Sequence, residues 1–158
     1  MARTKAKPPA RTARGPRTTK RRILPKAKAK ARPKQAFTAS HHREEDFKEG
    51  LRRYAIYRDL GISRATNGMV QAHVIRFVPP CRPEEVSKRH YHDVDFQMVY
   101  VLKGWIKTEL DGQGEIVMRQ GSCWIQPPRI EHVVLDYSDD CEVLEVILPA
   151  DFKTVELE

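Results

Sequence analysis

From residue 52 onward, short apolar runs alternate with turn-forming residues, a pattern typical of strands rather than long helices. Tyr54, Ile56 and the run Val70–Val78 begin the pattern with β-branched and aromatic residues, which favour strands. Further runs follow at a spacing of about 8–12 residues, which is typical of an antiparallel sandwich or barrel. These runs are 97–103, 105–110, 115–119, 122–126, 131–137 and 142–148.

The segments between the runs are rich in turn-forming residues. Asp111-Gly112 suits a tight hairpin, and the three prolines of residues 79–83 exclude that segment from a central strand. We expect a loop at residues 59–68 and one short helical turn at residues 44–51. The pattern therefore predicts an all-β fold of two packed antiparallel sheets.

The charge of the chain is divided unevenly. Residues 1–43 contain 15 Lys and Arg and no Asp or Glu, whereas residues 44–158 contain 14 basic and 21 acidic residues. The overall charge of +8 therefore describes a basic tail, and the remaining 115 residues carry a net charge of −7. That length is common for a single domain. We expect one domain at 44–158, preceded by a tail and linker at 1–43.

Residues 1–35 contain five prolines and almost no large apolar side chains. Such a segment buries too little apolar surface to offset the entropy of ordering, so the sequence predicts a disordered tail. Its charge suits non-specific contact with nucleic acid or another polyanion. The alternatives are a solvated appendage without a partner, an extension from a misassigned start codon, and a mitochondrial presequence, which the prolines disfavour.

The rest of the composition bears on cellular location. No apolar run approaches the about 20 residues that span a bilayer, and residues 1–35 lack the apolar stretch of a secretory signal. Three cysteines without CxxC spacing fit a reducing compartment rather than a disulfide scaffold. We therefore expect no membrane contact and a cytoplasmic protein.

Candidate chemistry is concentrated in three histidines and one amide. His90 and His92 are two residues apart, so on a strand their side chains point to the same face. Neutral imidazole suits Zn, Cu, Fe and Ni. Pairs of this kind also arise on solvated sheet faces, but Gln97 follows on the same stretch and His132 stands in a later strand. Three imidazoles and an amide can then converge inside one barrel.

These residues resemble the two signature motifs of the cupin superfamily. The first, His-x-His-x(3 or 4)-Glu-x(6)-Gly, corresponds here to His90-x-His92-x(4)-Gln97-x(6)-Gly104. The second, Gly-x(5)-Pro-x-Gly-x(2)-His-x(3)-Asn, corresponds to Gly121-x(5)-Pro127-x-Arg129-x(2)-His132-x(3)-Asp136. The resemblance covers about residues 50–150 and implies a jelly-roll β-barrel. It also implies one divalent transition metal ion (Fe, Mn, Ni, Zn or Cu) bound by His90, His92, Gln97 and His132.

Four residues depart from the family pattern. Glu84 replaces a leading glycine, Asp136 replaces the terminal asparagine, and Arg129 replaces the glycine of the second motif, so that turn must be built differently. Gln97 in place of Glu leaves the metal's charge uncancelled, which favours an anionic oxygen substrate. As an amide, Gln97 also has the alternative of hydrogen-bonding in the pocket without ligating.

The resemblance implies an enzyme that acts on a small oxygen-rich metabolite. The three-His-plus-Gln pattern is similar to that of small cupins that open unsaturated uronic acids by isomerisation or tautomerisation. Alternatives are an Fe(II)-dependent dioxygenase and a non-catalytic binding module tethered to nucleic acid by the tail. Asp136, four residues after His132, is a candidate general base, and Arg76 a candidate clamp for a substrate carboxylate. The resemblance further implies a homodimer.

Overall fold

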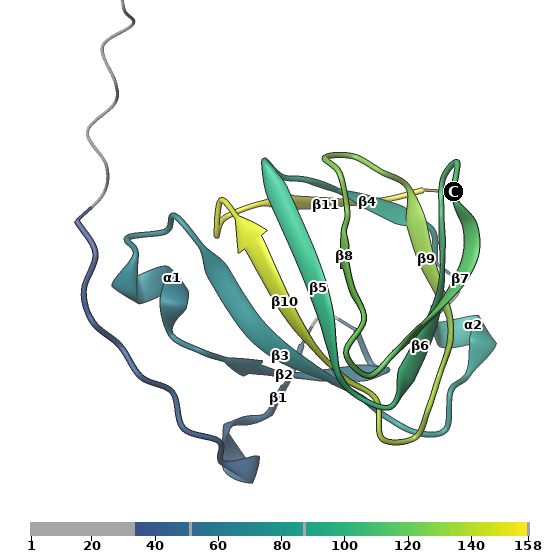
Figure 1. The fold of residues 1–158 in the computed structure, drawn as a ribbon, viewed down its shortest axis with the longest axis horizontal. Helices are drawn as coiled ribbons and strands as arrows, with labels where there is room; N and C mark the ends of the chain where they lie inside the picture. The colour runs from purple at the N-terminus through teal and green to yellow at the C-terminus, as the bar shows by residue number, and fades with distance from the viewer. Residues whose placement is uncertain (1–33, 51, 87, 158) are drawn as a thin grey trace, which may run out of the picture. The chain divides into compact units, whose positions relative to one another are not determined.

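The computed structural model describes residues 34–50, 52–86 and 88–157, and most of these residues lie in two antiparallel sheets (Figure 1). The predicted all-β jelly-roll architecture is confirmed. The predicted disorder and polyanion contact of the tail concern residues 1–35, of which residues 1–33 lie outside the described residues. In the described part of the chain, no helix is long and apolar enough to cross a membrane.

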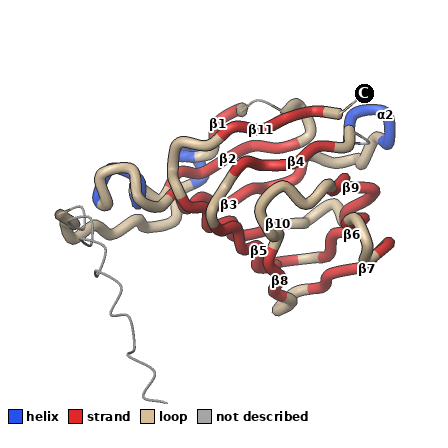
Figure 2. The backbone as a smooth tube through the Cα atoms, turned by 90° about the horizontal axis from the view of Figure 1, so that it is seen from above, coloured by secondary structure: helices blue, strands red, loops and turns tan. Residues whose placement is uncertain are grey.

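The strand order places segments that are distant in sequence side by side. The first sheet has the order β1 (Lys48–Glu49), β2 (Ala55–Asp59), β3 (Gln71–Phe77), β10 (Glu142–Leu148), β5 (Phe96–Lys103) and β8 (Cys123–Ile125). The second has the order β11 (Lys153–Glu156), β4 (His90–Asp93), β9 (His132–Tyr137), β6 (Trp105–Leu110) and β7 (Gly114–Arg119). Figure 2 shows the C-terminal strand β11 beside β4, with which it pairs.

Helical structure in the described residues is limited to three short turns. They are a 3-10 turn at Glu44–Asp46, α1 at Ile62–Ala65 and α2 at Pro83–Val86. The helical turn expected at 44–51 is therefore confined to three residues. Phe47 already has extended backbone angles, and the next two residues pair with β2 as strand β1.

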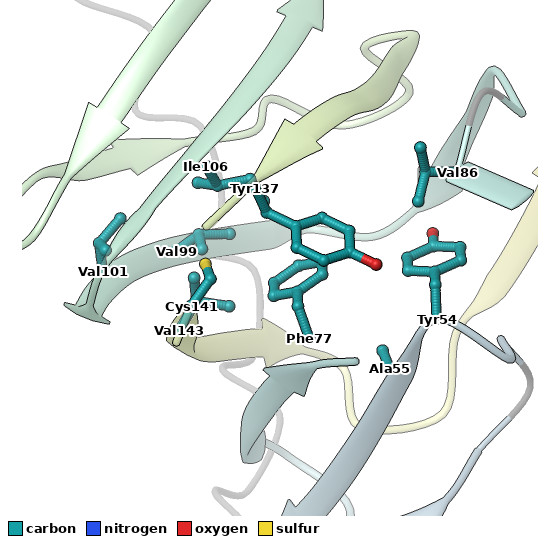
Figure 3. Packing of buried hydrophobic residues seen from close by; sticks show 10 residues of the cluster. All are labelled: Tyr54, Ala55, Phe77, Val86, Val99, Val101, Ile106, Tyr137, Cys141 and Val143. Carbon is teal, nitrogen blue, oxygen red and sulfur yellow. The ribbon is translucent and has the colours of Figure 1, made fainter. Parts of the chain in front are cut away.

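One end of the interior between the sheets is filled by apolar side chains. The rings of Phe77 and Tyr137 lie with their centroids 4.7 Å apart, and Tyr54 is stacked with Phe77 at a centroid distance of 6.2 Å. Figure 3 shows these three rings in the cluster. Val101 and Cys141 are fully buried in the same cluster. Burial of these inward-facing side chains is the main stabilising contribution to the fold.

Two turns of the signature motifs depend on left-handed backbone. Gly104 has φ +66°, and a Cβ atom there would lie 2.1 Å from Ser138 Oγ, so the chain needs glycine. Arg129 has φ +62°, so the expectation that its turn is built differently is wrong. The strained backbone is retained, and it is held by hydrogen bonds from Arg129 N to His92 O (3.1 Å) and from Arg129 Nε to Asp93 Oδ1 (2.9 Å).

The segment that the sequence assigns to a linker is attached to the barrel. The Arg58 guanidinium donates to Ser40 Oγ and His41 O, and Ala36 N donates to Ala65 O. The described residues of this segment belong to the same compact unit as the barrel. The linker is therefore part of this unit from its first described residues.

Candidate metal centre

Three histidines of the second sheet converge in the barrel interior. His90 and His132 are directly opposite each other on β4 and β9, and His92 follows on the same face of β4. The ring centroids lie 4.3 Å (His90–His132), 4.9 Å (His90–His92) and 5.2 Å (His92–His132) apart. One nitrogen from each ring lies within 4.8 Å of the others. The three imidazoles are therefore close enough to bind a single metal ion, as the motif spacing predicts.

Hydrogen bonds fix the orientation of all three rings. His90 Nδ1 donates to Lys88 O and His132 Nδ1 donates to Ile130 O, both at 2.9 Å. His92 Nδ1 is hydrogen-bonded to Thr154 Oγ1 at 2.9 Å, because β11 places Thr154 opposite His92. Each Nε2 is left available as a ligand. Such partners on the other ring nitrogen are typical of metal-binding histidines.

Burial keeps the three rings in the neutral form that metal binding requires. Desolvation lowers the pKa of His90 to about 3, and the neighbouring His132 contributes. Burial likewise lowers the pKa of His92 to about 4 and shifts that of His132 in the same direction. Neutral imidazoles with free Nε2 atoms can donate lone pairs at pH 7. The chemistry of this donor set fits a transition metal ion.

Gln97 comes from the opposite sheet and is almost completely buried, with 1% of its surface exposed. Its amide Nε2 donates to Glu145 Oε1 at 2.6 Å. It is not among the residues that line the cavity beside the three histidines. The amide is thus fixed by a carboxylate partner, which turns its nitrogen toward Glu145 and leaves Oε1 as the remaining polar atom.

Glu145 is a cavity residue that the sequence pattern did not identify. It stands opposite His73 on the neighbouring strand, and its Oε2 lies 2.6 Å from His73 Nε2. Burial by itself raises the pKa of a carboxyl group, but the hydrogen bonds from His73 and Gln97 outweigh it and lower the pKa of Glu145 below its ordinary value. The only signal in the sequence was an acidic residue in the middle of an apolar strand.

Two predicted site residues lie outside the cavity. Asp136 is exposed, because the pairing of β6 with β9 skips Leu135 and reverses the facing of the residues that follow. The side chain of Arg76 lies on the opposite face of β3 from that of His73. Its guanidinium forms ion pairs with Glu44 and Glu142 at 2.6 and 2.7 Å. Neither Asp136 nor Arg76 is among the residues that line the cavity beside the histidines, so the structure does not bring them together with the three imidazoles.

A cavity of about 300 Å³ adjoins the histidines. All three imidazoles line it, together with Glu145 and His73. Much of the remaining wall is apolar or aromatic, including Ile75, Phe77, Val99, Ile106 and Trp124. A mostly apolar cavity with a few polar groups is the usual form of a small-molecule site.

The fold and the three-histidine site define a cupin. Residues 81–147 match the family model described as "Cupin domain", and this match includes all three histidines. This part of the chain is therefore a cupin domain. No curated protein matches the chain.

Several solved structures share this fold with the chain. KdgF from Halomonas sp. is 19% identical, with a TM-score of 0.54 over 66% of this chain and 87% of that chain. The polyketide cyclase RemF from Streptomyces resistomycificus is 17% identical, with a TM-score of 0.58 over 75% and 85%. Oxalate decarboxylase from Bacillus subtilis is 16% identical, with a TM-score of 0.56 over 84% of this chain and 34% of that chain. At these identities the likeness concerns the fold.

Proposed function

We propose that this protein is a metal-dependent enzyme that isomerises or tautomerises a small oxygen-rich metabolite, as uronate-linearising cupins do. The observation that carries the proposal is the arrangement of the three imidazoles. Each Nδ1 is engaged by a neighbouring oxygen, and one nitrogen of each ring lies within 4.8 Å of the others. Histidines packed only for stability do not need this common orientation.

We assign the ion's ligands to His90, His92, His132 and Gln97. For Gln97 the supporting contact is its hydrogen bond to Glu145. A carboxylate accepts hydrogen bonds, so it selects the amide orientation in which the nitrogen faces Glu145. The oxygen is then the free atom, and Glu145 positions it as an outer partner positions a ligand.

A bound divalent ion (Fe, Mn, Ni, Zn or Cu) would supply Lewis-acid polarisation of a substrate oxygen. The chain itself must then move a proton. Glu145 takes this role in place of Asp136, because it lies in the cavity on the sheet facing the histidines. His73 holds the Glu145 carboxylate through its Nε2 and limits its rotation. The apolar walls limit the access of water.

Turnover assays under nitrogen separate this chemistry from a dioxygenase. Metal-loaded protein is offered unsaturated uronates without oxygen, and in parallel a panel of diketones and catechols with an oxygen electrode. Product formation under nitrogen supports isomerisation. Oxygen uptake with no anaerobic turnover contradicts it and favours the dioxygenase alternative.

Substitutions at two residues test their roles in that turnover. Glu145→Gln should retain metal and lower turnover by about 10²–10⁴-fold, the usual contribution of a general acid or base. Gln97→Glu should also retain metal, because carboxylate is the stronger ligand, but slow turnover by cancelling charge. Unchanged turnover of metal-loaded Gln97→Glu would reject the charge argument.

We further propose that the protein is a homodimer. Tyr100, Leu102 and Ile125 are exposed by 38%, 37% and 58%, and they lie on the outward face of β5 and of the edge strand β8. Exposed apolar side chains at a sheet edge suit contact with a second copy. Light scattering should give twice the chain mass of 18.3 kDa, and Ile125→Asp should shift the protein to monomer. A wild-type mass near 18.3 kDa would contradict the proposal.

A further inference from the structure

Two hydrogen-bond donors in the cavity wall have no partner. Among the described residues, three buried side-chain polar atoms lack one, and two of them, Arg52 Nη2 and Trp124 Nε1, belong to residues that line the cavity. An unpartnered buried donor is costly, and a charged one more so. Their shared location indicates that a ligand supplies the missing acceptors.

Arg52 is a cation without a counterion in the described structure. Its Nη1 donates to the hydroxyl of Tyr54 at 3.1 Å, which fixes the direction of the guanidinium. None of the ion pairs of the described residues includes Arg52, whereas Arg76 is paired with Glu44 and Glu142. Glu145, in the same cavity, is already bonded to His73 and Gln97. An anionic ligand is therefore the natural partner for Arg52.

The location of Arg52 determines where a bound anion would lie relative to the histidines. Arg52 lines the same cavity as His90, His92 and His132, so an anion bound to its guanidinium shares that cavity with the three rings. Trp124 is on β8, an edge strand of the first sheet, whereas Arg52 lies between β1 and β2 at the opposite side of that sheet. A ligand that meets both donors must therefore carry acceptors at two separate points.

We propose that the cavity binds a small hydroxy or keto acid, with its carboxylate on Arg52 and a second oxygen accepting from Trp124 Nε1. Guanidinium groups bind carboxylates with charge-assisted hydrogen bonds, and indole nitrogen donates to neutral oxygens. The cavity of about 300 Å³ restricts the ligand to a small metabolite. This substrate class rests on the proposed function for the placement of the reacting oxygen near the histidines, but Arg52 requires no metal to bind the carboxylate.

The test compares D-glucuronate with D-glucuronamide, which differ in one charged group. Both are titrated by calorimetry into chelator-treated protein. Glucuronate should bind roughly tenfold tighter, because charge-assisted hydrogen bonds are about twice as strong as neutral ones. Arg52→Gln should abolish this preference. Arg53→Gln, which removes the same charge from the exposed neighbouring residue, should keep it.

Trp124→Phe provides a second variant that keeps the aromatic ring. It should weaken both probes by a similar factor and leave the preference for glucuronate intact. Equal affinity of wild-type protein for the two probes, or no binding tighter than about 1 mM for either, overturns the proposal. So does a preference that survives in Arg52→Gln.

Metal titration of the same preparations separates the two proposals. Metal binding by the histidines without a carboxylate preference would contradict carboxylate binding by Arg52 and support the proposed metal site. A carboxylate preference that depends on Arg52, without metal binding, would support the carboxylate site and contradict the proposed metal site.

Discussion

The two ends of the barrel interior are built on the same strands but contain different chemistry. Successive inward-facing positions change from polar to apolar along β3, along β5 and from Glu145 to Val143 on β10. They read His73, Ile75 and Phe77 on β3, Gln97, Val99 and Val101 on β5, and Glu145 and Val143 on β10. Strand alternation therefore supplies inward positions at both ends. The side chains at those positions make one end a core and the other a site.

The difference between the two ends means that one end mainly contributes stability and the other mainly contributes binding. Apolar side chains at the core end gain free energy by burial. At the site end, His90, Gln97 and His132 are buried polar groups, which require hydrogen-bond partners to offset desolvation. Substitutions at the core end should therefore lower stability, and substitutions at the site end should mainly change binding.

The largest expected effect is that of Tyr137→Ala at the core end. Tyr137 packs on Phe77 at 4.7 Å, and its hydroxyl donates to Val78 O at 2.8 Å. Removing the ring should lower the free energy of unfolding by about 3–5 kcal/mol, as measured by urea denaturation. The folded fraction should still bind one equivalent of metal. Loss of metal from protein that remains folded would mean that the two ends are coupled.

At the site end, His132→Ala should lower metal affinity strongly and stability only slightly, in contrast to Tyr137→Ala. Removing a direct ligand should cost more metal affinity than the roughly 10–100-fold caused by losing an outer partner. The unfolding midpoint of the metal-free protein should change less than in Tyr137→Ala. Competition with a chelator measures the affinity, and wild-type affinity in this variant would exclude His132 as a ligand.

A smaller effect is expected when an outer partner of the site is removed. Thr154→Val deletes the hydroxyl that is hydrogen-bonded to His92 Nδ1 and should weaken metal binding by about 10–100-fold. Thr108→Val is the matched control, because the Thr108 hydroxyl donates to Val133 O in the same sheet and contacts no histidine nitrogen. Equal losses in the two variants would indicate a general loosening of the sheet.

The smallest expected response is that of Cys141 to alkylation. Burial raises the pKa of this core thiol from 9.0 to about 12. A raised pKa leaves less thiolate, so at pH 8 its reactive fraction falls by about a thousandfold. Iodoacetamide followed by mass spectrometry should leave Cys141 unmodified in folded protein and modify it in urea. Rapid native modification would show that the core end opens.

Motif spacing predicted the parts of the site that depend on local sequence. His90 and His92 share a face by strand alternation alone, and the position of His132 within the second motif placed it correctly. Gln97 was placed near the site by the same motifs, although its contact with Glu145 depends on the pairing of β10 with β5. Spacing along the chain carries no information about such a contact.

The failures have identifiable physical causes. Asp136 was placed by simple alternation, which the skipped residue Leu135 reverses. Arg76 is a candidate from its side-chain chemistry alone, and its strand parity relative to His73 places it on the opposite face of β3. Arg52 and Glu145 become visible only when the register of separate strands is known. The sheets themselves were predictable because short apolar runs and turn formers are local signals.

Elemental analysis of the purified protein tests the central claim most directly. Wild-type protein and the triple variant in which His90, His92 and His132 are alanine are expressed side by side, and bound transition metal is counted per chain. The account predicts about one equivalent in the wild type and almost none in the variant. A folded wild-type protein without metal, even after incubation with each candidate ion, would contradict the account, as would a variant that retains its metal.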